Sequence, residues 1–312
     1  MTLTVILPVC NGEQFVDAAL ADISEGTAEQ DEILVVDDGS EDGTAGILKH
    51  WIERDRRIRV LRTRGLGLVA ALNLGLGEAT HEWIARADAD DRYPHDRFTR
   101  QREALRDEVV LVTGDYRLVP PSGARTLIPS ALGHPFVAAG LIHPQRVPHP
   151  GVVYRKDAVL YAGGYLEADF PAEDLALWMR LCETGDLVGV PTVVVDWTLN
   201  PQSISHTRQA QQRAKTHELL GGFAPACVQR ITADEVEQEL ARYSQAPLGE
   251  QRALLLLRDL RAWGRRGYPV NHLRPLLRHF ARSPLGAMAA GWELTSSTRR
   301  RRSDRRVITQ PK

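Results

Sequence analysis

The sequence predicts an α/β protein: a Rossmann-like, mostly parallel sheet flanked by helices, followed by a helical C-terminal extension. Short apolar runs rich in Val, Ile and Leu alternate with amphipathic segments over the first 115 residues. Continuously apolar strands that alternate with helices are typical of parallel sheets covered on both faces. After about residue 207 the strand-like runs stop and helical patterns follow one another. The chain is therefore expected to begin with an α/β domain and to end in helices.

The first nine elements are expected to follow one another without interruption. Strands are assigned where four or five apolar residues are consecutive, and helices where apolar residues are spaced by three and four. The first helix is assigned from Phe15, Val16, Ala19, Leu20 and Ile23. The expected order is strand 3–7, helix 13–23, strand 32–36, helix 44–52, strand 58–61, helix 67–76, strand 83–87, helix 94–106 and strand 109–113.

The later elements are less regular. Residues 114–150 are rich in Pro, Gly and Ser and are expected to be irregular connections. The elements expected after them are strand 152–154, helix 156–161, helix 172–183, strands 187–190 and 192–197, and helices 207–220, 233–244, 249–264, 270–281 and 284–294. We therefore expect an α/β domain over residues 1–206, a helical extension over 207–296 and a basic, disordered tail over 297–312.

The bulk composition indicates a cytoplasmic protein. Its 39 basic and 40 acidic residues nearly balance, which argues against a nucleic-acid partner. Three cysteines without CxxC spacing suit a reducing compartment and argue against a zinc site. No apolar stretch approaches the roughly 20 residues that a membrane-spanning helix needs. The arginine-rich residues 299–306 are either a solvated tail or a peripheral contact with anionic lipid at the inner face of the plasma membrane.

Acidic residues follow two of the expected strands. Asp37 and Asp38 come after the second strand, and Asp88, Asp90 and Asp91 come after the fourth. Ligands of parallel sheets bind beyond the carboxyl ends of the strands. Three carboxylates within four residues repel one another, and a hard divalent cation such as Mg²⁺ or Mn²⁺ relieves that repulsion. Taken alone, the triplet is more typical of a solvated turn that caps the next helix, and Asp37-Asp38 suits such a turn as well as it suits a binding site.

Five segments, taken together and in order, resemble glycosyltransferase family 2. They are residues 8–13, 35–44, 67–75, 87–91 and the pair 163–165 with 173–181, so that the resemblance covers residues 3–206. It implies a GT-A fold, Mn²⁺ or Mg²⁺ as cofactor, and a UDP, GDP or TDP sugar as donor. It further implies inverting transfer of the sugar to a hydroxyl of a glycan or lipid-linked acceptor, in cell-envelope or polysaccharide synthesis.

The resemblance also assigns residues to the donor nucleotide. They are Pro8, Asn11, Glu13, Asp37, Asp38, Arg64 and Asp88. Asp38 would hold the nucleoside with help from Asp37, and Arg64 would lie near the base or the phosphates. Asp88 would contact the ribose or the sugar. Ser40 is expected to cap the helix that follows the second strand.

The metal and the acceptor proton are assigned in the same way. Asp90 would chelate the cation, and His206 falls where some relatives place a metal or phosphate contact, although a plain surface or core histidine is the alternative there. Asp91 is expected to cap the next helix. Glu173 and Asp174 resemble the acidic pair of the family, which implies that Asp174 is the general base. Both also suit the positive end of a helix without any catalytic role.

Two other functions remain open on the sequence alone. Residues 65–70 read GxGxxA and precede Asp88 by about 20 positions, as in an NAD(P)-dependent oxidoreductase. These glycines, however, lie in the third strand–helix unit instead of the first, and this function does not explain Asp37 and Asp38. The second alternative is a non-catalytic, nucleotide-binding relative of the glycosyltransferases.

Overall fold

The computed structural model describes residues 1–265, except 142–146, 224 and 230. The chain divides into two compact units, residues 1–230 and residues 231–312, and each is considered by itself. The first unit contains the sheet, and the described part of the second contains two helices. Among the described residues, no helix is both long enough and apolar enough to cross a lipid bilayer.

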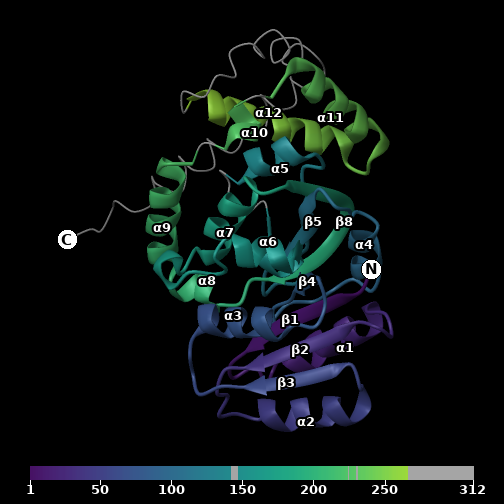
Figure 1. Cartoon of the computed structure of the whole chain (residues 1–312), viewed down its shortest axis with the longest axis vertical. Helices are drawn as coiled ribbons and strands as arrows, with labels where there is room; N and C mark the ends of the chain where they lie inside the picture. Colours follow the sequence, from purple (N-terminus) through teal and green to yellow (C-terminus); the bar gives the residue numbers. More distant parts are fainter. Residues whose placement is uncertain (142–146, 224, 230, 266–312) are drawn as a thin grey trace, which may run out of the picture. The chain divides into compact units, whose positions relative to one another are not determined.

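An eight-stranded sheet is the frame of the first unit (Figure 1). Its strands are β1 (Leu3–Val9), β2 (Glu32–Asp37), β3 (Ile58–Arg62), β4 (Trp83–Arg86), β5 (Val109–Val119), β6 (Thr126–Ile128), β7 (Val153–Arg155) and β8 (Asp186–Thr198). They are ordered β3-β2-β1-β4-β7-β5-β6, and β8 also pairs with β5. The pairs β1–β2, β2–β3, β1–β4 and β5–β8 are parallel, which confirms the mostly parallel sheet expected from the sequence.

Helices connect these strands. Those of the first unit are α1 (Val16–Gly26), α2 (Thr44–Arg54), α3 (Leu68–Glu78), α4 (Arg97–Arg102), α5 (His134–Gly140), α6 (Lys156–Tyr161), α7 (Glu173–Leu181), α8 (Ile204–Thr207), α9 (Gln209–Gly221) and α10 (Ala226–Gln229). α9 and α10, in the stretch that the sequence assigned to the helical extension, thus belong to the first unit.

The alternation of side chains along β1 explains how both faces of the sheet are covered. Leu3, Val5 and Leu7 point to one face, where they join a core cluster with the apolar sides of α1 and α2. Ile6 points to the opposite face, where α3 lies so close that Gly75 faces the Ile6 side chain. Because β1 is buried on both faces, its sequence is apolar at nearly every position.

The region around β5 differs from the expectation. Residues 114–150 were predicted to be irregular, but β5 continues to Val119, β6 follows, and α5 begins at His134. Gly114 and Asp115 resemble a turn in the sequence, yet they lie inside β5 at a register shift against β8. A Cβ at Gly114 would lie 2.4 Å from Cγ1 of Val194, so the glycine permits close pairing with β8. Tertiary pairing here overrides the local turn signal.

Two further element boundaries are corrected by the structure. The predicted strands 187–190 and 192–197 are one continuous strand, β8, because the pairing with β5 continues past Pro191. The helix predicted over 94–106 is shorter and spans Arg97–Arg102 as α4. The Arg97 N–H donates to the Pro94 carbonyl, so residues 94–97 form a turn and α4 begins only at its end.

The described part of the second unit is helical, with α11 (Ala233–Gln245) and α12 (Gly249–Arg265). A capping box begins α11: the Glu235 N–H donates to the Thr232 hydroxyl, and the Thr232 N–H donates to the Glu235 carboxylate. The helices expected over 233–244 and 249–264 are therefore present. The helices expected over 270–281 and 284–294 and the basic tail lie outside the described residues.

The close contact between α3 and β1 gives a test of the fold. We expect Gly75→Ala to lower the free energy of unfolding by about 1–3 kcal/mol, because the new Cβ would lie 2.8 Å from Cγ2 of Ile6. Gly77→Ala, on the same helix, adds its Cβ where no atom lies within 4 Å and should raise stability by about 0.4–1 kcal/mol. Urea titrations of both variants measure the difference, and equal stabilities would contradict this packing.

Candidate functional site

The candidate site lies at the edge of the sheet where β1, β2, β3 and β4 end. The register pairs Val9 with Asp37 and Asp37 with Arg62, so these three strand ends are level. Arg86, the last residue of β4, pairs with Ile6. The loops that carry the predicted aspartates therefore leave the sheet side by side, as expected for ligand sites of parallel sheets.

The loops after β1 and β2 are hydrogen-bonded to each other. The Asn11 N–H donates to Ser40 Oγ and the Glu41 N–H donates to Asn11 Oδ1, each over 2.9 Å. Glu13 Oε2 accepts the Gly43 N–H at the start of α2. Ser40 therefore holds the neighbouring loop, and the prediction that it caps α2 is wrong. Asn11 and Glu13 both join the loop after β1 to the loop after β2.

Asp37 and Asp38 have different partners. Asp37 Oδ1 accepts the Ser40 N–H, and Oδ2 lies 3.6 Å from Nε of Arg62. Asp38 holds the loop after β3: its carboxylate accepts the hydroxyl of Thr63 and the N–H groups of residues 66 and 67 over 2.7 and 2.8 Å. Burial raises the pKa of Asp38, but these hydrogen bonds outweigh burial and leave the pKa below its usual value.

The other residues predicted for the donor are placed around this loop. Pro8 is buried inside β1, which continues to Val9 instead of ending at Pro8. Arg64 is exposed, and its backbone lies against Gly39. In a dinucleotide-binding protein, the amides of such a loop bind a pyrophosphate. Here two of these amides donate to the Asp38 carboxylate instead.

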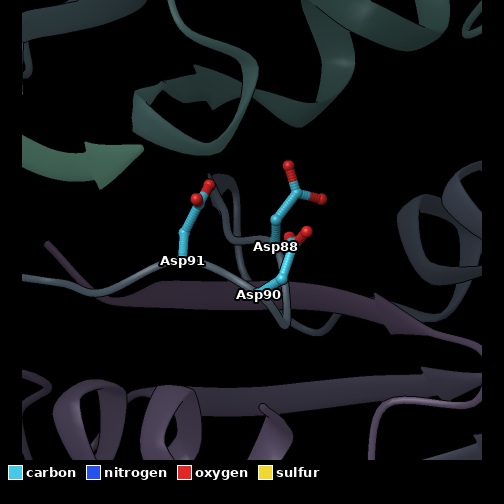
Figure 2. A group of neighbouring side chains, drawn as sticks. All are labelled: Asp88, Asp90 and Asp91. Atoms are coloured by element: carbon cyan, nitrogen blue, oxygen red, sulfur yellow. The ribbon is translucent and has the colours of Figure 1, made fainter. Parts of the chain in front are cut away.

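Asp88, Asp90 and Asp91 form one acidic group after β4. Figure 2 shows their side chains projecting from the same side of this loop, and one carboxylate oxygen from each lies within 4.8 Å of the others. Asp91 is nearly completely buried, and its Oδ2 has no hydrogen-bond partner among the described residues. A buried, unpartnered carboxylate oxygen beside two other carboxylates suits a hard divalent cation.

Burial and repulsion by neighbouring carboxylates raise the pKa values of Asp90 and Asp91. Burial has the largest effect on Asp90 and Asp91, and the charge of Asp88 adds to it in both cases. A carboxyl group binds its proton more tightly where the ionised form is poorly solvated and lies close to other negative charges. A bound cation would reverse this effect, because it stabilises the ionised forms.

A completely buried arginine, Arg86, lies under the acidic group. One of its Nη atoms is 2.6 Å from Asp88 Oδ1, and the other donates to the carbonyl of Ala87. The neighbouring Arg97 donates to the Arg86 carbonyl at 2.7 Å. The Tyr93 hydroxyl accepts the Asp88 N–H and donates to the Asp88 carbonyl. The backbone and the carboxylate of Asp88 are thus both fixed.

The end of β8 lies alongside the same loop. The Thr198 N–H donates to Asp91 Oδ1 over 2.7 Å, and Asn200 Nδ2 donates to Asp90 Oδ2 over 3.1 Å. Asp91 therefore does not cap a helix. The helix α4 starts later, at Arg97, and the Asp91 carboxylate accepts the Thr198 N–H at the end of β8 instead. His206 is exposed on α8, and the acidic group formed by the described residues does not include it.

Glu173 and Asp174 begin α7, as predicted. Burial raises the pKa of Glu173 to about 8, with a further contribution from the Asp174 charge. Burial also raises the pKa of Asp174 to about 6. The Asp88 charge raises both values and the Arg86 charge lowers both, so this pair lies within electrostatic reach of the acidic group. Glu173 Oε2 has no hydrogen-bond partner among the described residues.

The turn at residues 163–165 is hydrogen-bonded to both α3 and α7. Asn73 on α3 accepts the Tyr165 N–H and donates to the Tyr165 carbonyl, over 3.0 and 2.7 Å. Arg180 on α7 donates to the Gly164 carbonyl. The Tyr165 hydroxyl lies 3.0 Å from Nε2 of His149, whose pKa burial holds well below its ordinary value. His149 is thus a neutral core histidine.

Sequence reasoning missed Arg86 and Asn200. Arg86 could have been recognised from the sequence, because a lone charge in the apolar run 83–87 must find a partner when the strand is buried. Nothing in the sequence points to Asn200, since it lies 110 positions from Asp90 and its role depends on where β8 ends.

Comparison with known proteins agrees with this geometry. The family model described as glycosyl transferase family 2 matches residues 4–135. The amylovoran biosynthesis glycosyltransferase AmsE of Erwinia amylovora is 30% identical over 200 residues, which are 62% of this chain and 74% of AmsE. The chain belongs to glycosyltransferase family 2. This family 2 glycosyltransferase is therefore a transferase enzyme, and the oxidoreductase alternative is wrong.

A second relative of this family 2 glycosyltransferase has a more specific description. The UDP-Gal:alpha-D-GlcNAc-diphosphoundecaprenol beta-1,3-galactosyltransferase of Escherichia coli is 26% identical over 183 residues, 55% of this chain and 63% of that enzyme. For some other relatives the chain spans less than half of the length.

Solved structures confirm the GT-A type fold of this family 2 glycosyltransferase. TarS of S. aureus in complex with UDP has a TM-score of 0.58 at 20% identity, over 90% of this chain and 87% of TarS. The mannosyltransferase PcManGT of Pyrobaculum calidifontis, in complex with GDP-Man and Mn²⁺, also has a TM-score of 0.58, at 19% identity, over 92% and 83% of the two chains.

The raised pKa of Glu173 gives a pH-dependent prediction. Between pH 4.5 and about 8 the folded protein keeps a proton on Glu173 that the unfolded chain releases, so stability falls as pH rises through this range. Glu173→Gln removes this titration and should flatten the curve of unfolding free energy against pH. Urea titrations across pH 4.5–8 test this, with the exposed Glu167→Gln as control. Parallel curves for wild type and Glu173→Gln would contradict the assignment.

Proposed function

We propose that this protein is an inverting, metal-dependent glycosyltransferase that uses a nucleotide-diphosphate sugar. The observation that carries the proposal is the acidic group of Asp88, Asp90 and Asp91, with its buried, unpartnered oxygen, within electrostatic reach of Asp174. One half of the site would hold a cation and a diphosphate, and the other would receive a proton. Transfer of a sugar from a diphosphate to a hydroxyl needs both.

The donor half would be formed by the loops after β1 to β4. Asp90 would hold Mn²⁺ or Mg²⁺ with Asp88 or Asp91, and the bound cation would supply charge neutralisation of the departing diphosphate. His206 is a further candidate ligand, which would have to move from its exposed place on α8. Asp37 and Asp38 would contact the nucleoside, directly or by fixing the loop after β3. The remaining donor contacts proposed are Pro8, Asn11, Glu13, Arg64 and Asp88.

On the acceptor half, Asp174 would take the proton of the attacking hydroxyl. Its pKa of about 6 leaves it mainly ionised at neutral pH and still basic enough to accept a proton. Glu173, with a pKa of about 8, keeps its proton at that pH and would donate a hydrogen bond. A base on the face of the sugar opposite the leaving diphosphate gives inversion of the anomeric configuration.

The substrate classes are proposed from the relatives. UDP and GDP-Man in the structural neighbours support a nucleotide-diphosphate sugar, without deciding the base. AmsE and the E. coli galactosyltransferase support a glycan or lipid-linked acceptor in the synthesis of a cell-surface polysaccharide. Work on a lipid-linked acceptor would place the enzyme in the cytoplasm, at the inner face of the membrane.

Nucleotide binding gives the first test of this proposal. We expect UDP, GDP or TDP to raise the melting temperature when Mn²⁺ is present, and to have much less effect without it. A ligand at 100 times its dissociation constant stabilises the folded state by about 2.7 kcal/mol, which corresponds to roughly 5–10 °C for a domain of this size. Stabilisation by NAD without a metal would overturn the proposal.

The second test separates catalysis from binding. Asp174→Asn should lower the rate of sugar transfer by about 10²–10⁴-fold, since it removes the general base, and should leave the affinity for the donor nearly unchanged. Wild-type kcat/KM should fall below pH about 6, where Asp174 becomes protonated. Loss of donor binding in the variant would show that Asp174 is not the base. If the wild-type protein binds the donor but transfers no sugar, it would instead be a non-catalytic, nucleotide-binding relative of the glycosyltransferases.

A further inference from the structure

The segment after β8 is attached to two carboxylates of the acidic group. Arg92 and Asp196 exchange both backbone hydrogen bonds, so the chain leaving this group is paired with the end of β8. The Thr198 N–H then donates to Asp91, and the Asn200 side chain to Asp90. The position of the chain that enters α8 is therefore fixed at the candidate cation site.

The orientation of the Asn200 amide is set by its own turn. Its Oδ1 accepts the Gln202 N–H over 2.9 Å, which leaves Nδ2, a donor, to face Asp90. The Asn200 carbonyl accepts the Ser203 N–H, and Ser203 in turn is the N-cap of α8. One side chain thus joins Asp90 to the start of this helix. The amide is neutral, so it orients Asp90 without supplying a positive charge that would compete with a cation.

We propose that Asn200 is a positioning residue for Asp90 that couples cation binding to the order of residues 198–207. The inference rests on the proposed function, in which Asp90 is a cation ligand. Carboxylates that bind metals are held in place by hydrogen bonds from surrounding groups, and loss of such a partner weakens metal binding about 10–100-fold. The Asn200 amide is the side-chain partner of Asp90 in this structure.

Thermodynamic linkage makes the coupling reciprocal. If the Asn200 hydrogen bond strengthens cation binding when residues 198–207 are in place, then the cation must hold these residues in place by the same free energy. Cation binding should therefore slow hydrogen exchange of the amides that depend on this arrangement, including those of Thr198, Ser203 and His206.

The test compares Asn200→Ala with Gln202→Ala in the full-length protein. Gln202 lies on the same turn and its side chain is exposed, so its removal should change nothing. Mn²⁺ affinity is measured by electron paramagnetic resonance at a saturating concentration of UDP, GDP or TDP. We expect Asn200→Ala to weaken Mn²⁺ binding about 10–100-fold. Hydrogen exchange over residues 198–207, with and without Mn²⁺, should show cation-dependent protection in wild type and Gln202→Ala, but not in Asn200→Ala.

Each other outcome has a distinct meaning. Equal Mn²⁺ affinity in wild type and Asn200→Ala would overturn this inference and leave the proposed function intact. Weaker binding without cation-dependent protection in wild type would overturn the coupling. A wild-type protein that binds no Mn²⁺ with UDP, GDP or TDP would overturn the proposed function, and this inference with it. Circular dichroism and melting temperature confirm that the Asn200→Ala variant is folded.

Discussion

The buried ion pair between Arg86 and Asp88 is the interaction on which the site depends. Arg86 is fully buried at the end of β4, and a buried charge is strongly destabilising unless a partner compensates it. Its guanidinium pairs with Asp88 and, at longer range, favours the ionised forms of Asp90, Glu173 and Asp174. The positive charge of Arg86 therefore matters both to the fold and to the site. Without it, the carboxylates on both sides of the site would repel one another in a poorly solvated region.

The two halves of the site are also linked mechanically, through α3. Asp38 holds the loop that leads into α3, and Asn73 on the same helix holds the turn that is hydrogen-bonded to α7. Hydrogen bonds to a buried or half-buried backbone are costly to lose, because the freed groups have no water to replace the partner. The loop after β3 and the turn that Arg180 of α7 contacts are thus both tied to a helix that carries neither a proposed base nor a proposed metal ligand.

The sequence predicted the sheet well, because buried parallel strands are apolar at almost every position and are easily recognised. It also placed the acidic residues at strand ends, and the resemblance to the family connected Asp174 with them. It could not predict how long-range pairing would override local signals. Asp91 was expected to cap a helix and residues 114–150 to be irregular, but β8 determines the place of Asp91 and of Gly114. Asn200 and Arg86 became visible only with the fold, since their partners depend on where strands end.

The antiparallel bridge between Arg92 and Asp196 has a consequence for how the protein is made. The acidic group is synthesised about a hundred residues before Thr198 and Asn200, which hold two of its carboxylates. Contacts of such large sequence separation form late and slow folding. A nascent chain that has emerged only as far as α4 therefore contains Asp90 and Asp91 without the hydrogen bonds from Thr198 and Asn200. The hydrogen bonds from Thr198 and Asn200 can form only when β8 has joined the sheet, so the restraint of these two carboxylates marks the completion of the domain during translation.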